Sequence, residues 1–360
     1  MGHMMIPKPL SNSTNILLSL CLFLIVSCSA EDNSPNNISW DVSEGVIFPE
    51  GGKLSRAEDG VILPDGTLIV ADQRYGLAKI DLSGNVSAFG GFEALNYEHN
   101  QPKAISGPNG VHLTPDGQHV ITADVFNGKI YKTSVQNNSS EVVYVHEYGA
   151  NTAREDSTGS LWFTQSTENQ NEERLYKSLN QAISDGALYR LPLSEDRTLS
   201  KPELVLENLY FANGFSIDEE RSKFYLSETM KNRVLAFDLD LSTGSLSNRE
   251  TLAIIPTPDN MELDSEGQLW VASPLSNQIY SIDPTNGESF VIFDAQTSSG
   301  LKNMEEGIRR METGNGFVDL ITPELTGEMP GLLTGVIIGN SGQPFYVANL
   351  GTALIKISRD

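Results

Sequence analysis

The chain has 360 residues, 39% hydrophobic and 20% charged, which is enough to bury a large core within a single all-β domain. Its formal net charge is −23, and an acidic excess of this size repels nucleic-acid phosphates and anionic lipid headgroups. Composition therefore argues against nucleic acid and the bilayer surface as partners, although acidity alone identifies no function.

The first 28 residues have the form of an export signal. The apolar run Asn15–Val26 is too short to span a bilayer comfortably, and Ile25-Val26-Ser27 is a small-residue cleavage site directly before Cys28. This arrangement resembles the bacterial lipoprotein signal, in which Cys28 becomes the lipidated first residue; an ordinary cleaved signal peptide is the alternative. We therefore expect an exported lipoprotein of the cell envelope whose only membrane contact is the lipid anchor on Cys28.

The cysteines and the segment after them divide the chain. Cys21 and Cys28 are the two cysteines of the sequence, so the folded domain has neither a disulfide nor a cysteine ligand. Residues 29–38 are polar, contain proline and lack periodicity, which predicts a flexible tether. The expected division is a signal peptide and lipobox over 1–28, this tether, and a folded domain over 39–360.

Six segments of the folded domain repeat one pattern of strand, turn, apolar strand, polar turn and strand. The first turns carry suitable residues, such as Pro64-Asp65-Gly66, and second strands such as Thr67–Ala71 are apolar on both faces. Units of this kind, recurring roughly every 40–50 residues without long helices between them, predict an all-β six-bladed β-propeller. Trp40–Phe48, before the first copy, is predicted to pair with the last blade and close the ring.

Two gaps between copies are longer than the others and are predicted to hold short helical insertions. Apolar residues share one helical face in each: Leu175, Leu179, Ala182 and Ile183 in the first, and Met304, Ile308 and Met311 in the second. The inserts either form lids over one mouth of the channel or pack on the surface.

One position of the repeat carries a side-chain oxygen in every copy. It lies eight residues before the turn positions Gly66, Gly117, Gly159, Arg221, Gly267 and Gly342, and it holds Glu58, Asn109, Asn151, Asn213, Asp259 and Thr334. Because the first strand of each blade lines the axis, these residues would form a ring at one height. Two carboxylates, three amides and a hydroxyl suit Ca²⁺ better than Mg²⁺ or Zn²⁺. The alternative is that Asn and Asp begin strands here as turn formers.

Several stretches of the sequence resemble the motifs of a known protein superfamily. The stretches PNGVHLTPDG, YFANGFSIDEERSKFYLSET and PDNMELDSEGQLWVA are similar to motifs of the SMP-30/gluconolactonase/LRE superfamily, over nearly all of residues 40–360. The pair LYFANGFSI and SETMKNRV, both inserts and the ending GQPFYVANLGTALIKI resemble its strictosidine synthase-like branch, which includes adipocyte plasma membrane-associated protein.

The resemblance implies a six-bladed propeller with Ca²⁺ at the bottom of an open cleft, held by Glu58, Asn151, Asn213 and Asp259. Asn109 would be a further ligand or a substrate contact, and Asn260 would orient Asp259 or contact substrate. Thr152 follows Asn151 where lactonase relatives usually have Asp.

Such a site predicts metal-assisted hydrolysis of a lactone or aryl ester, with the ion polarising the carbonyl of a small-molecule substrate. Asp259 would serve as base or nucleophile, and His99 in the loop LNYEHNQPK is a candidate general base. His112, three residues after Asn109, is expected on the opposite strand face in a structural role. The sequence has no Gly-x-Ser-x-Gly elbow, no His-Glu-x-x-His and no phosphate loop.

Two other functions stay open. A propeller lipoprotein could bind a ligand without chemistry. A condensation of the strictosidine synthase type would need a buried glutamate beside an apolar pocket, for which Glu324 and Glu328 are the candidates. We expect the protein to be a monomer.

Overall fold

The structure is a computed structural model that describes residues 38–99, 106–169 and 171–359. The predicted signal segment with Cys28, and nearly all of the predicted tether, lie outside the described residues, so both stay predictions. None of the described helices is both long enough and apolar enough to cross a membrane.

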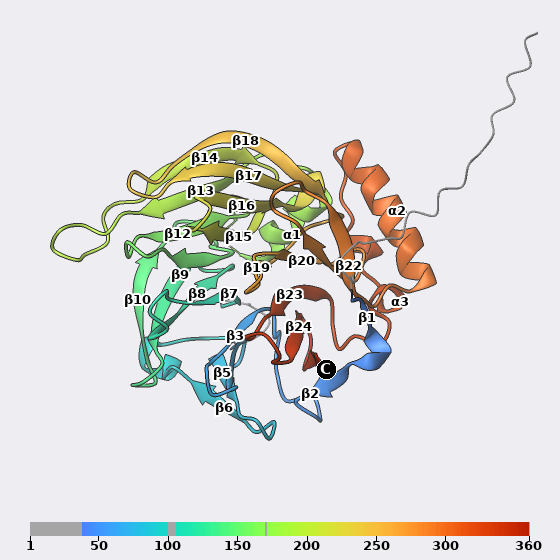
Figure 1. The fold of residues 1–360 in the computed structure, drawn as a ribbon, viewed down its shortest axis with the longest axis horizontal. Helices are drawn as coiled ribbons and strands as arrows, with labels where there is room; N and C mark the ends of the chain where they lie inside the picture. Colours follow the sequence, from blue (N-terminus) through green and yellow to red (C-terminus); the bar gives the residue numbers. More distant parts are fainter. Residues whose placement is uncertain (1–37, 100–105, 170, 360) are drawn as a thin grey trace, which may run out of the picture. The chain divides into compact units, whose positions relative to one another are not determined.

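Six sheets stand around a common axis, and each is one blade of a propeller (Figure 1). The blades below are given with their strands in order from the axis outward. Blade one contains β3 (Gly60–Ile62), β4 (Leu68–Asp72), β5 (Gly76–Ile80) and β6 (Val86–Phe89). Blade two contains β7 (Pro108–Leu113), β8 (His119–Asp124), β9 (Lys129–Ser134) and β10 (Ser139–Val145). Blade three contains β11 (Ala153–Glu155), β12 (Leu161–Gln165), β13 (Gly186–Leu191) and β14 (Glu203–Leu209).

The second half of the ring repeats this order. Blade four contains β15 (Ala212–Asp218), β16 (Lys223–Glu228), β17 (Arg233–Asp240) and β18 (Ser245–Ile254). Blade five contains β19 (Met261–Leu263), β20 (Leu269–Ser273), β21 (Gln278–Ile282), β22 (Ser289–Asp294) and β1 (Trp40–Asp41). Blade six contains β23 (Leu333–Ile337), β24 (Phe345–Asn349), β25 (Leu354–Ile357) and β2 (Val46–Phe48). The six-bladed fold predicted from the repeat is confirmed.

The ring closes through the N-terminal segment, but across two blades. β2 pairs antiparallel with β25 in the last blade, as predicted, whereas β1 pairs parallel with β22 in blade five. The single predicted strand over Trp40–Phe48 is divided because Asp41 and Glu44 form a capping box around a 3₁₀ turn, Val42–Glu44. The first segment of the domain therefore joins both of the last two blades.

The core lies between neighbouring blades. Every residue of β4, β12, β20 and β24 is buried, because each second strand is covered by a blade on both faces. Trp162 of blade three, for example, packs against Phe215 and Phe224 of blade four. An apolar cluster of this kind fills each of the six blade interfaces.

The two inserts contain three α-helices: α1 (Glu172–Asn180), α2 (Ser298–Glu312) and α3 (Pro323–Thr326). α1 begins at the cap Asn171 and α2 at the cap Thr297, each of which accepts a backbone N–H of the first turn. The predicted apolar face of the second insert is confirmed. The first helix ends at Asn180 and not at Ile183, because Gln181 leaves it to form a β-bridge with Asn315.

Candidate metal centre at the channel axis

The six residues of the upper ring, as we call the aligned repeat positions, are all buried, with 2–8% of their surface exposed. They begin or directly precede the inner strands, which gather around the centre of the propeller (Figure 1). Contacts between blades show that they converge. Asn109 Nδ2 donates to Asn151 Oδ1 at 3.2 Å, and Thr334 Oγ1 donates to the backbone oxygen of Glu58 at 2.9 Å.

Hydroxyl groups of the second strands and the loops after them fix two ring amides. Asn151 Nδ2 donates to Ser166 Oγ at 2.9 Å, and Asn213 Nδ2 donates to Thr229 Oγ1 at 3.1 Å. The Thr229 hydroxyl itself donates to Pro258 O at 2.7 Å, so it can only accept from Asn213. With its N–H group held in this way, Asn213 has its carbonyl oxygen free for another partner, whereas Asn151 Oδ1 also accepts from Asn109 Nδ2 and from Thr152 Oγ1.

The upper ring is short of positive charge and of hydrogen-bond donors. Among the described residues, Glu58 Oε2 and Asn213 Oδ1 are buried and accept no hydrogen bond, and an orphaned buried acceptor costs about 1–3 kcal/mol. Burial, and next the charge of Asp259, raises the pKa of Glu58 to about 8. Burial raises the pKa of Asp259 to about 8, and the charge of Asp59 acts in the same direction.

This donor set fits a hard cation. Glu58, Asp259, Asn151 and Asn213 offer two carboxylates and two amide oxygens, the ligand types that Ca²⁺ takes. The described residues include no group of three or more His, Cys, Asp or Glu side chains that could hold a metal. A cation here would therefore depend on the amides as well as on the carboxylates.

The other two ring residues are engaged elsewhere. Arg56 donates to Asn109 Oδ1 at 2.8 Å and to Pro108 O at 2.7 Å, so the oxygen of Asn109 already has a cationic partner. The Thr334 hydroxyl links blades six and one through the backbone. Of the four ring residues that the family resemblance implies as ligands, Glu58 and Asn213 have an oxygen without a hydrogen bond, while Asn151 Oδ1 accepts only from neutral donors.

Asn260 lies just behind the ring. Its Nδ2 donates to Glu58 Oε1 at 2.9 Å, and its Oδ1 accepts from Thr152 Oγ1 at 3.2 Å. Thr152 stands where lactonase relatives usually have Asp, so here a neutral hydroxyl takes part in orienting the Glu58 carboxylate through Asn260. The side chain of Asn260 thus contacts Glu58, and its predicted roles in orienting Asp259 or contacting substrate stay predictions.

A lower layer lies three residues further along the same strands. His112 Nδ1 is 3.0 Å from Glu262 Oε1, and Arg154 contacts both oxygens of Glu262 at 2.7 and 3.1 Å. His112 comes from blade two and Glu262 from blade five, so His112 faces the channel. The expectation from simple alternation was wrong because a β-bulge between Pro108 and Val111 reverses the parity of the strand.

Sequence reasoning missed most of this layer and Arg56. Arg154 and Glu262 occur three residues after ring positions Asn151 and Asp259, as His112 does after Asn109, so the same alignment could have found them. Arg56 has no counterpart in the repeat. It reaches Asn109 from a loop, and only the fold brings the two together.

Three further candidates do not reach the ring. His99 is partly buried at the end of a described segment, and none of its described contacts joins it to a ring residue, so its catalytic role stays a prediction. Glu324 and Glu328 are exposed. They therefore do not supply the buried glutamate that a condensation would need.

The inserts lie at the same end of the blades as the upper ring, and Figure 1 shows α2 and α3 at the outer edge beside β22 and β1. α1 leaves blade three directly after β12, and the second insert leads into β23, which carries Thr334. The two join through Phe317 N to Leu179 O at 3.1 Å, and they share an apolar cluster with the loop residues Phe126 and Met230. The inserts thus pack on each other and on these loops, which fits both the lid and the surface-packing alternatives, so both stay predictions.

A cleft of about 460 Å³ opens at this end, between α1 and the loops of blades one, two and six. Arg56 and Phe126 line it from the ring side, and Glu172 and Tyr176 line it from α1. Arg56 connects the cleft with the ring through its hydrogen bond to Asn109.

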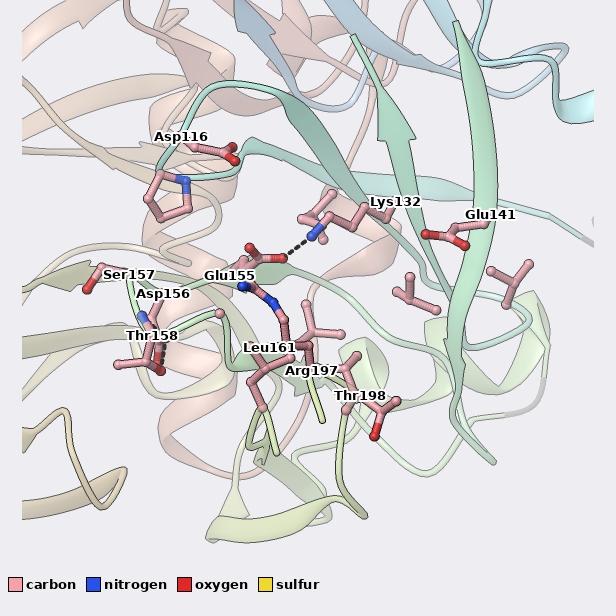
Figure 2. A pocket seen from close by; sticks show the side chains of 17 residues that line it. Asp116, Lys132, Glu141, Glu155, Asp156, Ser157, Thr158, Leu161, Arg197 and Thr198 are labelled. Carbon is pink, nitrogen blue, oxygen red and sulfur yellow. Dashed lines mark hydrogen bonds and ion pairs between the residues drawn. The ribbon is translucent and has the colours of Figure 1, made fainter. Parts of the chain in front are cut away.

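A larger hollow of about 600 Å³ lies between blades two and three, away from the ring (Figure 2). Its charges are largely matched within the protein. Lys132 Nζ lies 2.6 Å from Glu155, as the dashed line in Figure 2 shows, and Asp156 accepts hydrogen bonds from its own turn. The upper-ring residues line neither this groove nor the cleft beside α1, but Arg56 of that cleft is hydrogen-bonded to the ring, so we place the candidate site at the axis and not here.

Comparison with known proteins identifies the family of the chain. The family model of the SMP-30/Gluconolactonase/LRE-like region matches residues 40–148 and 140–298. Regucalcin from Danio rerio is 33% identical over 110 residues, which is 29% of this chain and 36% of that protein. Regucalcin from Homo sapiens is 33% identical over 107 residues, which is 29% of this chain and 34% of that protein. These alignments span about a third of the length of the curated relatives.

Solved structures share the fold at low identity. A gluconolactonase from Xanthomonas campestris superposes with a TM-score of 0.57 at 15% identity, covering 85% of this chain and 87% of that one. A calcium-binding protein, regucalcin, from Agrobacterium tumefaciens superposes with a TM-score of 0.58 at 15% identity, covering 89% and 95%. At this identity the likeness shows the propeller fold alone.

Proposed function

Because this chain belongs to the SMP-30/gluconolactonase/LRE-like family, we propose that it is a calcium-dependent hydrolase of lactones or aryl esters, with its reaction centre at the upper ring. The family model covers most of the propeller, and similar proteins include a gluconolactonase and a calcium-binding regucalcin. The observation that carries the proposal is the pair of buried oxygens without a hydrogen bond, Glu58 Oε2 and Asn213 Oδ1, in a ring whose two carboxylates have their pKa values raised to about 8.

In this proposal Glu58, Asn151, Asn213 and Asp259 hold the ion. When bound, Ca²⁺ would polarise the scissile carbonyl as a Lewis acid. Asn260 and Thr152 keep the Glu58 carboxylate in place, and Ser166 and Thr229 do the same for the two amides. The ring is thus orientated before substrate arrives, which is what electrostatic stabilisation of a transition state requires.

Asp259 is the proposed base. It is the most exposed member of the upper ring, at 8%, and so the carboxylate nearest to incoming solvent. The oxygen of water bonds to the carbonyl carbon, and the water proton passes to Asp259. The acyl C–O bond then breaks, and the proton passes to the leaving oxygen, giving a carboxylate and an alcohol, or a single hydroxy acid from a lactone. Direct attack by Asp259 is the alternative.

The test uses the folded chain, a chromogenic aryl ester and a simple lactone. Turnover should be lost on chelation and restored by Ca²⁺, and calorimetry should show a Ca²⁺ site that Asp259→Asn removes. Glu324→Gln is the matched control, because it removes one exposed carboxylate far from the ring. Turnover that persists after confirmed metal removal would overturn the mechanism. Calcium binding without turnover of any ester or lactone would favour a non-catalytic binding propeller.

Cellular placement is a separate part of the proposal. We propose that the protein is exported, anchored through a lipid on Cys28, monomeric, and active on a small molecule without nucleic-acid partners. It rests on the sequence of residues 1–28 and on the acidic charge. Palmitate labelling that is unchanged in Cys28→Ser would exclude the anchor.

A further inference from the structure

The cleft beside α1 has an unusual cation at its inner end. Arg56 hydrogen-bonds to two neutral oxygens, Pro108 O and Asn109 Oδ1, and it is a member of none of the ion pairs formed by the described residues. Burial raises the pKa values of the carboxylates Glu58, Asp259 and Asp124, and the charge of Arg56 acts on them at longer range to lower these values. By contrast, Arg154 in the lower layer is paired with a carboxylate. A guanidinium stays charged at any pH a protein tolerates, so the cleft ends in a fixed positive charge.

The charge balance at this point depends on the ring. A divalent ion would neutralise Glu58 and Asp259, two carboxylates whose pKa burial raises and the charge of Arg56 lowers. The charge of Arg56 also opposes the effect of burial on the pKa of Asp124, but that carboxylate is held by backbone N–H groups and forms no ion pair with Arg56. A ligand that carries one negative charge would give Arg56 a direct partner, and a planar carboxylate matches the fork of the guanidinium.

The walls of the cleft indicate the rest of the ligand. The Arg56 guanidinium lies 5.4 Å from the centre of the Phe126 ring, and Tyr176 stands on the α1 side. Glu172, also on α1, disfavours a second anionic group at the outer end, so the anion of a ligand would point inward. The volume of about 460 Å³ suits a small molecule with an apolar or aromatic body.

We infer that this cleft binds the anionic end of the substrate, and that Arg56 selects esters or lactones that already carry a carboxylate. The inference rests on the proposed function, because it names the substrate class of that site. Arg56 is here a specificity-determining residue: it holds the substrate carboxylate while the scissile carbonyl lies at the upper ring. Bond making and breaking are unchanged from the hydrolysis proposed above.

Two matched esters test the inference. Phenyl acetate is neutral, and 4-acetoxybenzoate has the same reacting bond with an added carboxylate. The calcium-loaded protein should prefer 4-acetoxybenzoate by at least about 10-fold in kcat/KM. Arg56→Gln should lower kcat/KM for 4-acetoxybenzoate by about 10- to 100-fold, mainly by raising KM. The same variant should change kcat/KM for phenyl acetate by less than about 3-fold. Lys302→Gln, an exposed residue of α2, is the control for an equal change of net charge.

Binding gives a second readout that needs no turnover. Calorimetry should show that 4-hydroxybenzoate binds the calcium-loaded protein, that phenol binds at least about 10-fold more weakly, and that Arg56→Gln removes the difference. Arg56→Lys should retain part of it. Because the preference is measured in the unchanged protein first, a misfolded Arg56→Gln leaves the test intact.

The outcomes separate the two proposals. Equal affinity for 4-hydroxybenzoate and phenol, or an equal loss of both esters in Arg56→Gln, overturns the inference whether or not the protein is a hydrolase. Arg56-dependent binding of 4-hydroxybenzoate with no turnover of either ester supports the anion site and overturns the hydrolase.

Discussion

The upper ring and the lower layer lie three residues apart on the same inner strands, yet their charges are arranged in opposite ways. In the upper ring, burial raises the pKa of both Glu58 and Asp259 to about 8. In the lower layer, burial alone would raise the pKa of Glu262, but Arg154 and a hydrogen bond with His112 lower it to about 2. Within the described part of the chain, the carboxylates of the upper ring have no ion-pair partner, whereas Glu262 of the lower layer has one in Arg154.

This difference shows that individual side chains, and not the propeller fold, decide which layer can take a metal. Both layers lie in one channel, although Arg154 and Glu262 are 15% and 23% exposed, against 2–8% for the upper ring. We expect charge, more than this difference in burial, to decide which of the two layers takes a metal. The presence of Arg154 beside Glu262, and the absence of an equally close cation beside Glu58, separate them. A calcium site should therefore be confined to the upper layer, and three measurements can challenge that statement.

The largest effect is expected on calcium affinity. Glu58→Gln should raise the Kd for Ca²⁺ by about 1,000-fold, an effect of about 4 kcal/mol, because it removes a buried charged ligand. Glu262→Gln, which removes the same charge from the lower layer, should change it by less than about 5-fold. Calorimetric titration of chelated protein measures both. If the two variants raise the Kd for Ca²⁺ equally, the calcium site is not confined to the upper layer.

A smaller effect is expected on folding stability. Arg154→Met should lower the free energy of unfolding by about 3 kcal/mol, since it leaves Glu262 without its partner; we take the low end of the range because that side chain is 23% exposed. Urea unfolding in saturating Ca²⁺ provides the value. The double variant Arg154→Met with Glu262→Gln should recover part of the loss, and a double variant no better than the single one would contradict the pairing.

The smallest effect concerns pH. Burial, and next the charge of Arg154, lowers the pKa of His112 to about 4, while Glu262 and Asp59 face the same ring. The unfolded chain binds a proton at His112 near pH 6.5 and the folded chain near pH 4. Stability from this residue is therefore full above about pH 6.5 and is lost as pH falls toward 4.

The unfolding free energy should fall by about 1–2 kcal/mol less between pH 7 and pH 4.5 in His112→Asn than in the unchanged protein. Thermal unfolding at the two pH values measures this difference. His119→Asn is the matched control, since this histidine lies at the first turn of blade two, outside the channel. A slope that persists in His112→Asn would mean that other groups carry it.

Much of the fold could be predicted from the sequence because it is repeated. In five of the six first turns the aligned residue is a glycine with positive φ, from +68° at Gly117 to +84° at Gly66. Blade four differs: there Ser222, one residue later, takes the left-handed conformation at φ +54°. Because the residues of such turns can be recognised in the sequence and recur in each repeat, they predicted the number of blades and the position of the ring.

What could not be predicted depended on departures from regularity. The bulge near Asn109 moved His112 to the channel face, and the capping box at Asp41 divided the closing strand. Arg56 meets Asn109 across 53 residues of sequence, so no local pattern connects them. These features arise from a single extra residue or from a tertiary contact, and the alternation of apolar residues along a strand predicts neither.

The lower layer also bears on how molecules could move through the channel. His112 and Arg154, from blades two and three, contact Glu262 of blade five across the axis below the ring, where the three line a hollow of about 190 Å³. If this layer closes the far end and the proposed hydrolysis takes place at the ring, substrate and product share the mouth beside Arg56. We then expect the leaving hydroxy acid to compete with the next molecule that enters.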